Sequence, residues 1–215
     1  YIHQRNNKIQ INGLWALDVY WKPTGKVTIY NQLLVDDIIV NNEPGQNDRA
    51  EHPDRLGITS GMVLADVVTD GSQIRVTYTR IGNWTYMSYR TWENYVYHRR
   101  GLGYPENSVE SVRLDMDYLG KPPFVVHTSF GYRRHGEQNI LHVFGDRIEK
   151  FPRGRVEHSR TVLFKVQYLP SVHYNFEFFV QYDTFTNKAN VVGQSDRDYM
   201  LGLVAHLSFG KGFVF

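Results

Sequence analysis

Apolar and polar residues alternate with a period of two along most of this chain, a pattern typical of β-strands with two different faces. In the segment 199–208 all odd positions from Tyr199 to Leu207 are apolar, and the even positions are mostly small or polar. Two segments near 26–36 and 58–68 are also strand-like, although their facing is ambiguous. The clearest alternation occurs in segments 13–22, 74–79, 112–118, 124–133, 161–168, 176–183 and 199–208. The pattern predicts an all-β chain of about nine strands.

The predicted connections between these strands alternate between short and long. The short ones are 23–25, 69–73, 120–123 and 170–171, and the long ones are 37–57, 83–108, 135–157 and 185–197. In an antiparallel sheet this order places every short turn at one end and every long connection at the other. Outer-membrane barrels have short periplasmic turns and long extracellular loops. The alternation therefore favours a membrane barrel.

A soluble β-sandwich also alternates, with its apolar faces turned inward. Two features favour the barrel: the polar rows carry several charges per strand, and aromatic residues stand at the ends of the apolar rows, where a membrane girdle would lie. These end residues are Tyr118, Tyr132, Tyr168, Tyr182 and Tyr199. A helical membrane span is excluded because no run of 18 apolar residues occurs. We predict an antiparallel transmembrane β-barrel.

An odd number of strands is a problem for such a barrel, because single-chain bacterial barrels have even numbers. An open sheet would leave unpaired backbone groups in lipid at both edges. We therefore expect residues 1–215 to be one barrel region, the carboxyl half of a larger barrel. A tenth strand within 1–12 is the alternative. The sequence has no Cys, which excludes disulfides and Cys-bound zinc, and its net charge of +2 gives no reason to expect nucleic-acid binding.

Several motifs resemble one known family. The run from Ile29 to Asp37 resembles its YGQLLLDD strand end, and the run from Val76 to Tyr86 resembles its EYTRINNWTY stretch. Residues 97–108 resemble its loop with the LGHP motif, with Tyr104 in place of the usual His, and residues 132–137 resemble the hairpin end that follows. Over about residues 13–209, the chain is similar to the carboxyl half of the Wzi-type capsule-assembly outer-membrane β-barrels.

The resemblance implies a roughly eighteen-stranded barrel in the bacterial outer membrane that binds or organises capsular polysaccharide. It implies no enzymatic activity and no cofactor. The expected partners are outer-membrane lipid, lipopolysaccharide, acidic surface polysaccharide, and either the amino-terminal half of the same barrel or a partner chain. Two alternatives stay open: a porin-like channel with a charged lumen, and an architectural subunit of an envelope assembly.

The long segment 83–108 and the start of the basic segment 133–160 contain the candidate polysaccharide-binding residues, and the surface polysaccharide is expected to be held by the long connections 37–57, 83–108 and 135–157. Aromatic rings offer flat apolar surface to sugar faces, and Arg binds carboxylates in a bidentate way. An equally simple interpretation is that the aromatic residues pack the loop onto the barrel or form its girdle. The candidates are Trp84, Tyr86, Arg90, Trp92, Tyr95, Tyr97, Arg99, Arg100, Arg133 and Arg134.

Charged residues in the polar rows are expected to line a lumen and to pair across it rather than to catalyse a reaction. They are Arg113, Asp115, Asp117, His127, Lys165 and Asp183. Asp36 and Asp37 at a strand end form a candidate Ca²⁺ site, because hard cations prefer several oxygen ligands. The scattered His residues predict no other metal site, and neither a Gly-x-Ser-x-Gly nor a phosphate-loop motif occurs.

Overall fold

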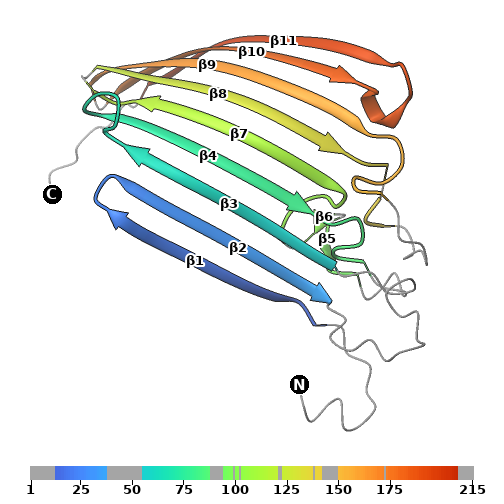
Figure 1. Cartoon of the computed structure of the whole chain (residues 1–215). Coiled ribbons are helices and arrows are strands. Elements are labelled where there is room, and N and C mark those ends of the chain that lie inside the picture. Colours follow the sequence, from blue (N-terminus) through green and yellow to red (C-terminus); the bar gives the residue numbers. More distant parts are fainter. Residues whose placement is uncertain are drawn as a thin grey trace, which may run out of the picture.

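The computed structural model describes residues 13–37, 55–87, 94–98, 100–101, 103–120, 123–137, 139–141, 150–171 and 173–207. They form a nine-stranded antiparallel sheet and a separate two-stranded hairpin (Figure 1). The strands of the sheet, in spatial order, are β1 (Trp15–Thr24), β2 (Val27–Asp37), β3 (Arg55–Ala65), β4 (Ser72–Ile81), β7 (Val109–Tyr118), β8 (Phe124–His135), β9 (Glu157–Ser171), β10 (Tyr174–Thr186) and β11 (Ser195–Leu207). The hairpin consists of β5 (Val96–Tyr97) and β6 (Arg100–Gly101).

The predicted all-β class and the nine strands are confirmed. The sheet is open, since β1 and β11 are its two edges and do not pair with each other. Each main strand pairs with the next one along the sheet, so the topology is a simple meander. Figure 1 shows all short turns at one end and the long connections at the other, as the sequence predicts. Within the described residues, no helix has the length and apolar character needed to cross a membrane.

The turn between β3 and β4 explains one difference from the predicted boundaries. Gly71 adopts a φ of 78°, and its N–H donates a hydrogen bond of 2.7 Å to Asp66 Oδ1. Asp66 also has a positive φ of 53°. Such conformations suit Gly and Asp in turns and end a strand. The strand expected near 58–68 therefore ends at Ala65. Its first residue is Arg55, three positions earlier than expected.

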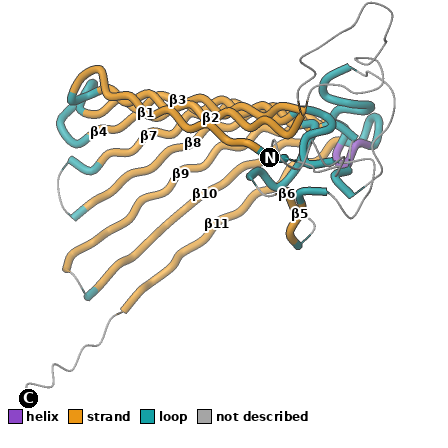
Figure 2. Tube along the Cα trace, turned by 90° about the horizontal axis from the view of Figure 1, so that it is seen from below, coloured by secondary structure: helices purple, strands orange, loops and turns teal. Residues whose placement is uncertain are grey.

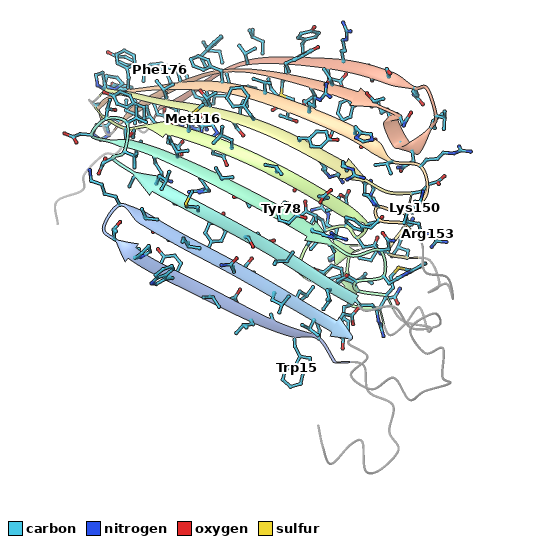
Figure 3. The ribbon with its side chains drawn as sticks, in the orientation of Figure 1. Trp15, Tyr78, Met116, Lys150, Arg153 and Phe176 are labelled. Carbon is cyan, nitrogen blue, oxygen red and sulfur yellow. The ribbon has the colours of Figure 1, made fainter. Side chains whose placement is uncertain are left out.

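One face of the sheet is apolar over all nine strands, and we call it the apolar face. Strand register places its side chains in continuous rows, one of which runs through Val76, Leu114, Phe130, Val162, Tyr182 and Tyr199. Trp15 on β1 and Phe176 on β10 belong to the same face and are 58% and 39% exposed (Figure 3). In the described part of the chain, no second layer covers these side chains, unlike in a sandwich.

The opposite face is polar, and we call it the polar face. Aromatic rings cover two glycines there: a Cβ on Gly61 would lie 2.1 Å from the Tyr30 ring, and one on Gly202 would lie 2.2 Å from the Phe179 ring. Both are directly paired positions on neighbouring strands. A ring over a cross-strand glycine shields backbone that would otherwise be bare. Figure 2 shows that the whole sheet is curved rather than flat.

The packed apolar core lies at the long-connection end and not along the sheet. Its buried members are Ile81 at the end of β4, Tyr86 in the connection that follows, Val109 at the start of β7, and Ile140 after β8. Trp84 and Met87 form a second small cluster. The core thus fastens loop segments to the strand ends, and it leaves the apolar face of the sheet exposed.

Candidate functional site

The connection between β4 and β7 folds back against the polar face, and Tyr86 fixes its position. The Tyr86 N–H donates a 2.8 Å hydrogen bond to Asp36 Oδ2 at the end of β2. Its hydroxyl oxygen accepts a 2.8 Å hydrogen bond from the N–H of Tyr104. Burial raises the pKa of the Tyr86 hydroxyl, because the charged phenolate would lose hydration. The residue therefore joins the two ends of this connection to the sheet.

Asp36 acts as an anchor for the same connection. Its carboxylate is buried, and Arg55 Nη1 lies 3.8 Å from Asp36 Oδ2. Arg55 Nη1 also donates a hydrogen bond to the carbonyl oxygen of Met87. The side chain of Asp37, the other candidate Ca²⁺ ligand, lies outside the described residues. Among the residues that the structure describes, no group of three His, Asp or Glu side chains is placed to hold a metal ion.

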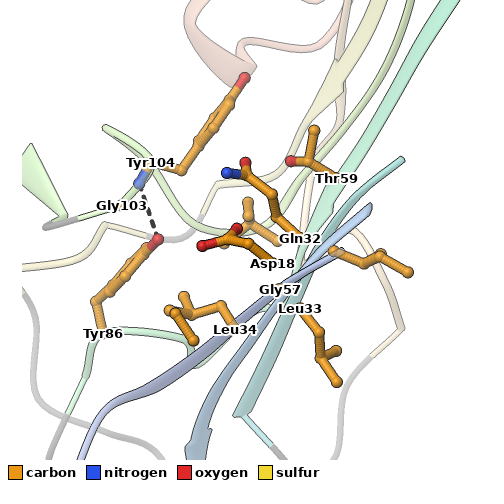
Figure 4. A pocket seen from close by; sticks show the side chains of 12 residues that line it. Asp18, Gln32, Leu33, Leu34, Gly57, Thr59, Tyr86, Gly103 and Tyr104 are labelled. Atoms are coloured by element: carbon orange, nitrogen blue, oxygen red, sulfur yellow. Dashed lines mark hydrogen bonds between the residues drawn. The ribbon is translucent and has the colours of Figure 1, made fainter. Parts of the chain in front are cut away.

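A pocket of about 190 Å³ lies between this connection and the first three strands (Figure 4). Asp18, Gln32 and Thr59 supply its polar wall, and they are directly paired positions on β1, β2 and β3. Tyr86 and Tyr104 line the side formed by the connection. A carboxylate, an amide and a hydroxyl together can accept and donate several hydrogen bonds, while the tyrosines and nearby Leu34 offer apolar surface. This combination suits a ligand with both hydroxyl groups and a C–H face.

Further along the polar face, charged side chains are hydrogen-bonded to one another. Arg113 Nε donates to Asp115 Oδ1 over 2.8 Å, and His127 Nδ1 lies 2.6 Å from Asp117 Oδ1. The Nε2 atom of His127 is 3.9 Å from Asp115 Oδ1, so this histidine stands between two carboxylates. Lys165 Nζ lies 3.6 Å from Glu177 Oε2. Pairing of this kind holds the side chains in fixed orientations on a polar surface.

Asp183 lies on the same face, where it accepts hydrogen bonds from Thr161 and Gln181. Thus the structure places all six of the predicted lumen residues on one face: Arg113, Asp115, Asp117, His127, Lys165 and Asp183. A hollow of about 320 Å³ lies beside this network, above Gly131 and between Arg113 and Arg133. Gly131 adds no side chain to this hollow, and a Cβ at that position would lie 3.7 Å from its nearest neighbour, Thr161 Cβ.

The structure separates the predicted polysaccharide-binding residues. Trp84 and Tyr86 are buried, with 3% and 1% exposure: the Tyr86 ring packs against Ile81 and Val109 at the strand ends, and the Trp84 ring packs within the connection against Met87. Tyr95 packs half-buried against the core, whereas Tyr97 on β5 and Arg100 on β6 are exposed. Arg90, Trp92 and Arg99 lie outside the described residues.

The two remaining candidates, on β8, point to opposite faces of the sheet. Arg133 lies on the polar face and forms ion pairs with Glu106 and Glu157. Arg134 lies on the apolar face, where its Nη1 donates a 2.9 Å hydrogen bond to Glu110 Oε2. Alternation along a strand explains this separation of adjacent residues. The pair therefore does not form one basic site.

Sequence reasoning did not find the pocket residues Asp18, Gln32 and Thr59. Each is an ordinary member of a polar row, and the three are far apart in the chain. Only the strand register brings them together. The signal in the sequence that could have found them was the facing of the strands near 26–36 and 58–68, which the alternation of residues leaves ambiguous.

Comparisons with protein-family models, with curated proteins and with solved structures find no match to this chain. The fold itself defines the class: an all-β protein built on an open, nine-stranded antiparallel sheet with one apolar and one polar face.

Proposed function

We propose that this chain forms part of a transmembrane β-barrel in the bacterial outer membrane, with its apolar face toward lipid and its polar face toward an aqueous interior. The supporting observation is a band on the apolar face that spans all nine strands without an Asp, Glu, Lys or Arg among its described residues. On β9, this band runs from Val162 to Tyr168, and its large side chains are about 40% exposed. Soluble monomers rarely expose apolar patches beyond a few hundred Å².

The position of the band changes systematically from strand to strand. On β1 it runs from Trp15 to Trp21, and on β11 its described residues run from Tyr199 to Ala205. Register connects Trp21, at the short-turn end of the first band, to Tyr199, at the long-connection end of the last one. Over eight strand steps the band shifts by about six residues, which corresponds to a strand tilt of about 30°. Strands of transmembrane barrels are tilted by about 35–45°.

The free edges of β1 and β11 require further strands in this proposal. Unpaired N–H and C=O groups in lipid cost several kcal/mol each, so the barrel is completed by other strands. These strands belong to the same polypeptide or to a partner chain. A barrel of about eighteen strands, similar to the Wzi-type capsule-assembly proteins, is consistent with the nine strands found here.

The long-connection end then faces the cell exterior, and we propose that it holds surface polysaccharide. The pocket of Asp18, Gln32 and Thr59 supports this role, because it combines hydrogen-bonding groups with tyrosine surface. The exposed Tyr97 and Arg100 extend this end of the molecule toward solvent. The network of paired charges on the polar face favours a second role as a porin-like channel, which conductance across planar bilayers would reveal.

The absence of Cys from this chain allows a direct test of the membrane orientation. In the full-length polypeptide reconstituted into vesicles, single cysteines replace Phe164 on the apolar face and its neighbour Leu163 on the polar face. A bimane label at 164 should be quenched by doxyl lipids, and a label at 163 should be quenched by aqueous iodide. Equal quenching of both labels by iodide would refute the membrane assignment.

Polysaccharide binding is tested by saturation-transfer NMR with methyl glucoside, methyl galactoside, methyl mannoside and methyl glucuronide. Lauryldimethylamine oxide should solubilise the protein, because detergents with sugar headgroups would compete. Asp18→Asn and Thr59→Val should each weaken transfer at least threefold. Thr28→Val, the same change on the polar face of β2 but outside the pocket, should leave it unchanged. Equal transfer for all variants would show that the pocket holds no sugar.

A further inference from the structure

The apolar face ends in a group of arginines at the long-connection end, which we call the arginine belt. Its members are Arg80 on β4, Arg134 on β8, Arg160 on β9 and Arg197 on β11. Register places all four on the apolar face, in the two rows at and just beyond Tyr78 and Tyr132. The cations therefore lie immediately outside the apolar band.

The opposite end of this face has a different composition. There the band ends in aromatic and aliphatic side chains, among them Tyr118, Phe124, Tyr168 and Tyr174. No Lys or Arg of a described strand shares the apolar face at that end. The charge asymmetry is therefore a property of the face itself, not of the chain as a whole, whose net charge is only +2.

The arginines of the belt are only partly neutralised. Among the side chains that the structure describes, Glu110 is the one acidic group on the apolar face, and it is bonded to Arg134 and to the hydroxyl of Tyr78. The Arg80 guanidinium lies 4.1 Å from the centre of the Phe151 ring. This cation–π contact stabilises the guanidinium without neutralising its positive charge, as a carboxylate would. Arg160 and Arg197 are exposed, and among the described residues neither side chain has an ion pair.

An apolar groove adjoins the belt at Arg160. It has a volume of about 570 Å³, and its lining includes Val112, Leu114, Phe130, Tyr132 and Val162. The groove therefore presents hydrocarbon surface along its length and a guanidinium on its border. A ligand that fits both features has an acyl chain and an anionic headgroup.

We propose that the arginine belt and the adjoining groove bind a membrane lipid through its phosphate group and one acyl chain. Guanidinium groups bind phosphate oxygens bidentately, and this pairing is strong at the membrane interface, where hydration is reduced. The site would orient the protein, because only the leaflet at the long-connection end meets the belt. This inference rests on the proposed membrane location and adds a lipid class and residues to it.

The test uses the full-length polypeptide in lauryldimethylamine oxide micelles, with bisphosphorylated lipid A as the probe and native mass spectrometry as the readout. Dephosphorylated lipid A and inorganic phosphate serve as comparison probes. Wild-type protein should retain lipid A at least tenfold more tightly than the dephosphorylated form, and inorganic phosphate at the same concentration should not displace it. Equal retention of both lipids would overturn the proposal. Displacement by inorganic phosphate would show an anion site without lipid specificity and would also overturn it.

Variants then locate the site. Replacing Arg160 and Arg197 with Gln should weaken lipid A binding by about 25-fold, since each interfacial arginine contributes about a fivefold factor. The control replaces Lys22 and Arg75 with Gln, which removes the same charge from the polar face. Unchanged binding by the first double variant would overturn the proposal, as would an equal loss in the control. Arg160→Lys with Arg197→Lys, which keeps the charge, should show an intermediate loss if the Gln variant fails to assemble.

These outcomes are separate from those of the proposed function. A protein whose apolar face is not in lipid fails the bimane test described above, whatever its behaviour toward lipid A. A protein that passes that test but binds both forms of lipid A equally is a membrane protein without the phosphate site.

Discussion

Substitution of Phe164 by Arg is the most discriminating stability test of the apolar face. Phe164 lies four residues from Arg160 and four from Tyr168 along β9. At about 3.3 Å per residue, each of these ends is about 13 Å away along the strand. The strand tilt of about 30° inferred from the shift of the band reduces this to about 11 Å of depth. Phe164 therefore lies near the centre of the apolar band.

An arginine at the midplane of a bilayer destabilises a transmembrane barrel by about 2–4 kcal/mol, and one near the interface by about 0–1 kcal/mol. We expect Phe164→Arg to show the full effect and Val162→Arg, two residues closer to Arg160, a smaller one. Leu163→Arg is the matched control, because Leu163 is the intervening residue on the polar face. Leu163→Arg should lower the free energy of unfolding less than either of the other two substitutions, since its guanidinium reaches an aqueous interior.

The assay is equilibrium guanidinium unfolding of the full-length polypeptide in phospholipid vesicles, followed by tryptophan fluorescence. The order of destabilisation should be Phe164→Arg, then Val162→Arg, then Leu163→Arg. If Leu163→Arg proves the most harmful of the three, the face we assign to lipid is wrong. If all three cost less than about 0.5 kcal/mol, the band does not enter a bilayer at all.

Three further predictions concern the polar face and the connection that folds onto it. Tyr86→Phe removes the acceptor of the Tyr104 N–H and should lower the free energy of unfolding by about 1 kcal/mol, measured by denaturant titration. Burial raises the pKa of the Tyr86 hydroxyl, so this tyrosine ionises at a lower pH in the unfolded chain than in the folded one. The stability that the neutral hydroxyl contributes is complete below about pH 10 and is lost as the pH rises above it. The phenylalanine variant should therefore lose less stability than the wild type between about pH 9 and 11. Gly202→Ala should cost about 1–3 kcal/mol, because its Cβ would lie 2.2 Å from the Phe179 ring. Gly131→Ala is its control, since the nearest atom there is 3.7 Å away and thermal unfolding should be almost unchanged.

The sequence was sufficient to predict the sheet because its signal is local and repeated. Alternation identified the two faces of every strand except those near 26–36 and 58–68, and the alternating connection lengths placed all short turns at one end. The boundaries of β3 were less predictable, because the turn at Asp66 and Gly71 depends on positive φ angles that the alternation does not encode. Strand pairing also follows, since sequential strands with short turns pair with their neighbours.

The candidate site was harder to predict because it depends on contacts between distant segments. Trp84 and Tyr86 have the composition of a sugar-binding loop, yet both rings are buried by the fold-back of the connection. Aromatic composition alone cannot distinguish a ring that binds a ligand from a ring that packs a loop. Asp18, by contrast, belongs to an ordinary polar row, and only its pairing with Gln32 and the approach of Tyr104 make it part of a pocket.

The buried tyrosine and the exposed pocket are consequences of the same arrangement. Asp36 and Tyr104 hold the two ends of Tyr86, so the connection is fixed against β1 to β3 at a definite height. That position leaves the pocket open between the connection and the three strands, and the side chains of Ile81 and Leu34 pack closely over Gly57 in its lining. A looser connection would expose the aromatic rings and abolish the pocket wall. Of the residues expected to contact a polysaccharide directly, Tyr86 is the one that lines this pocket in the described part of the chain.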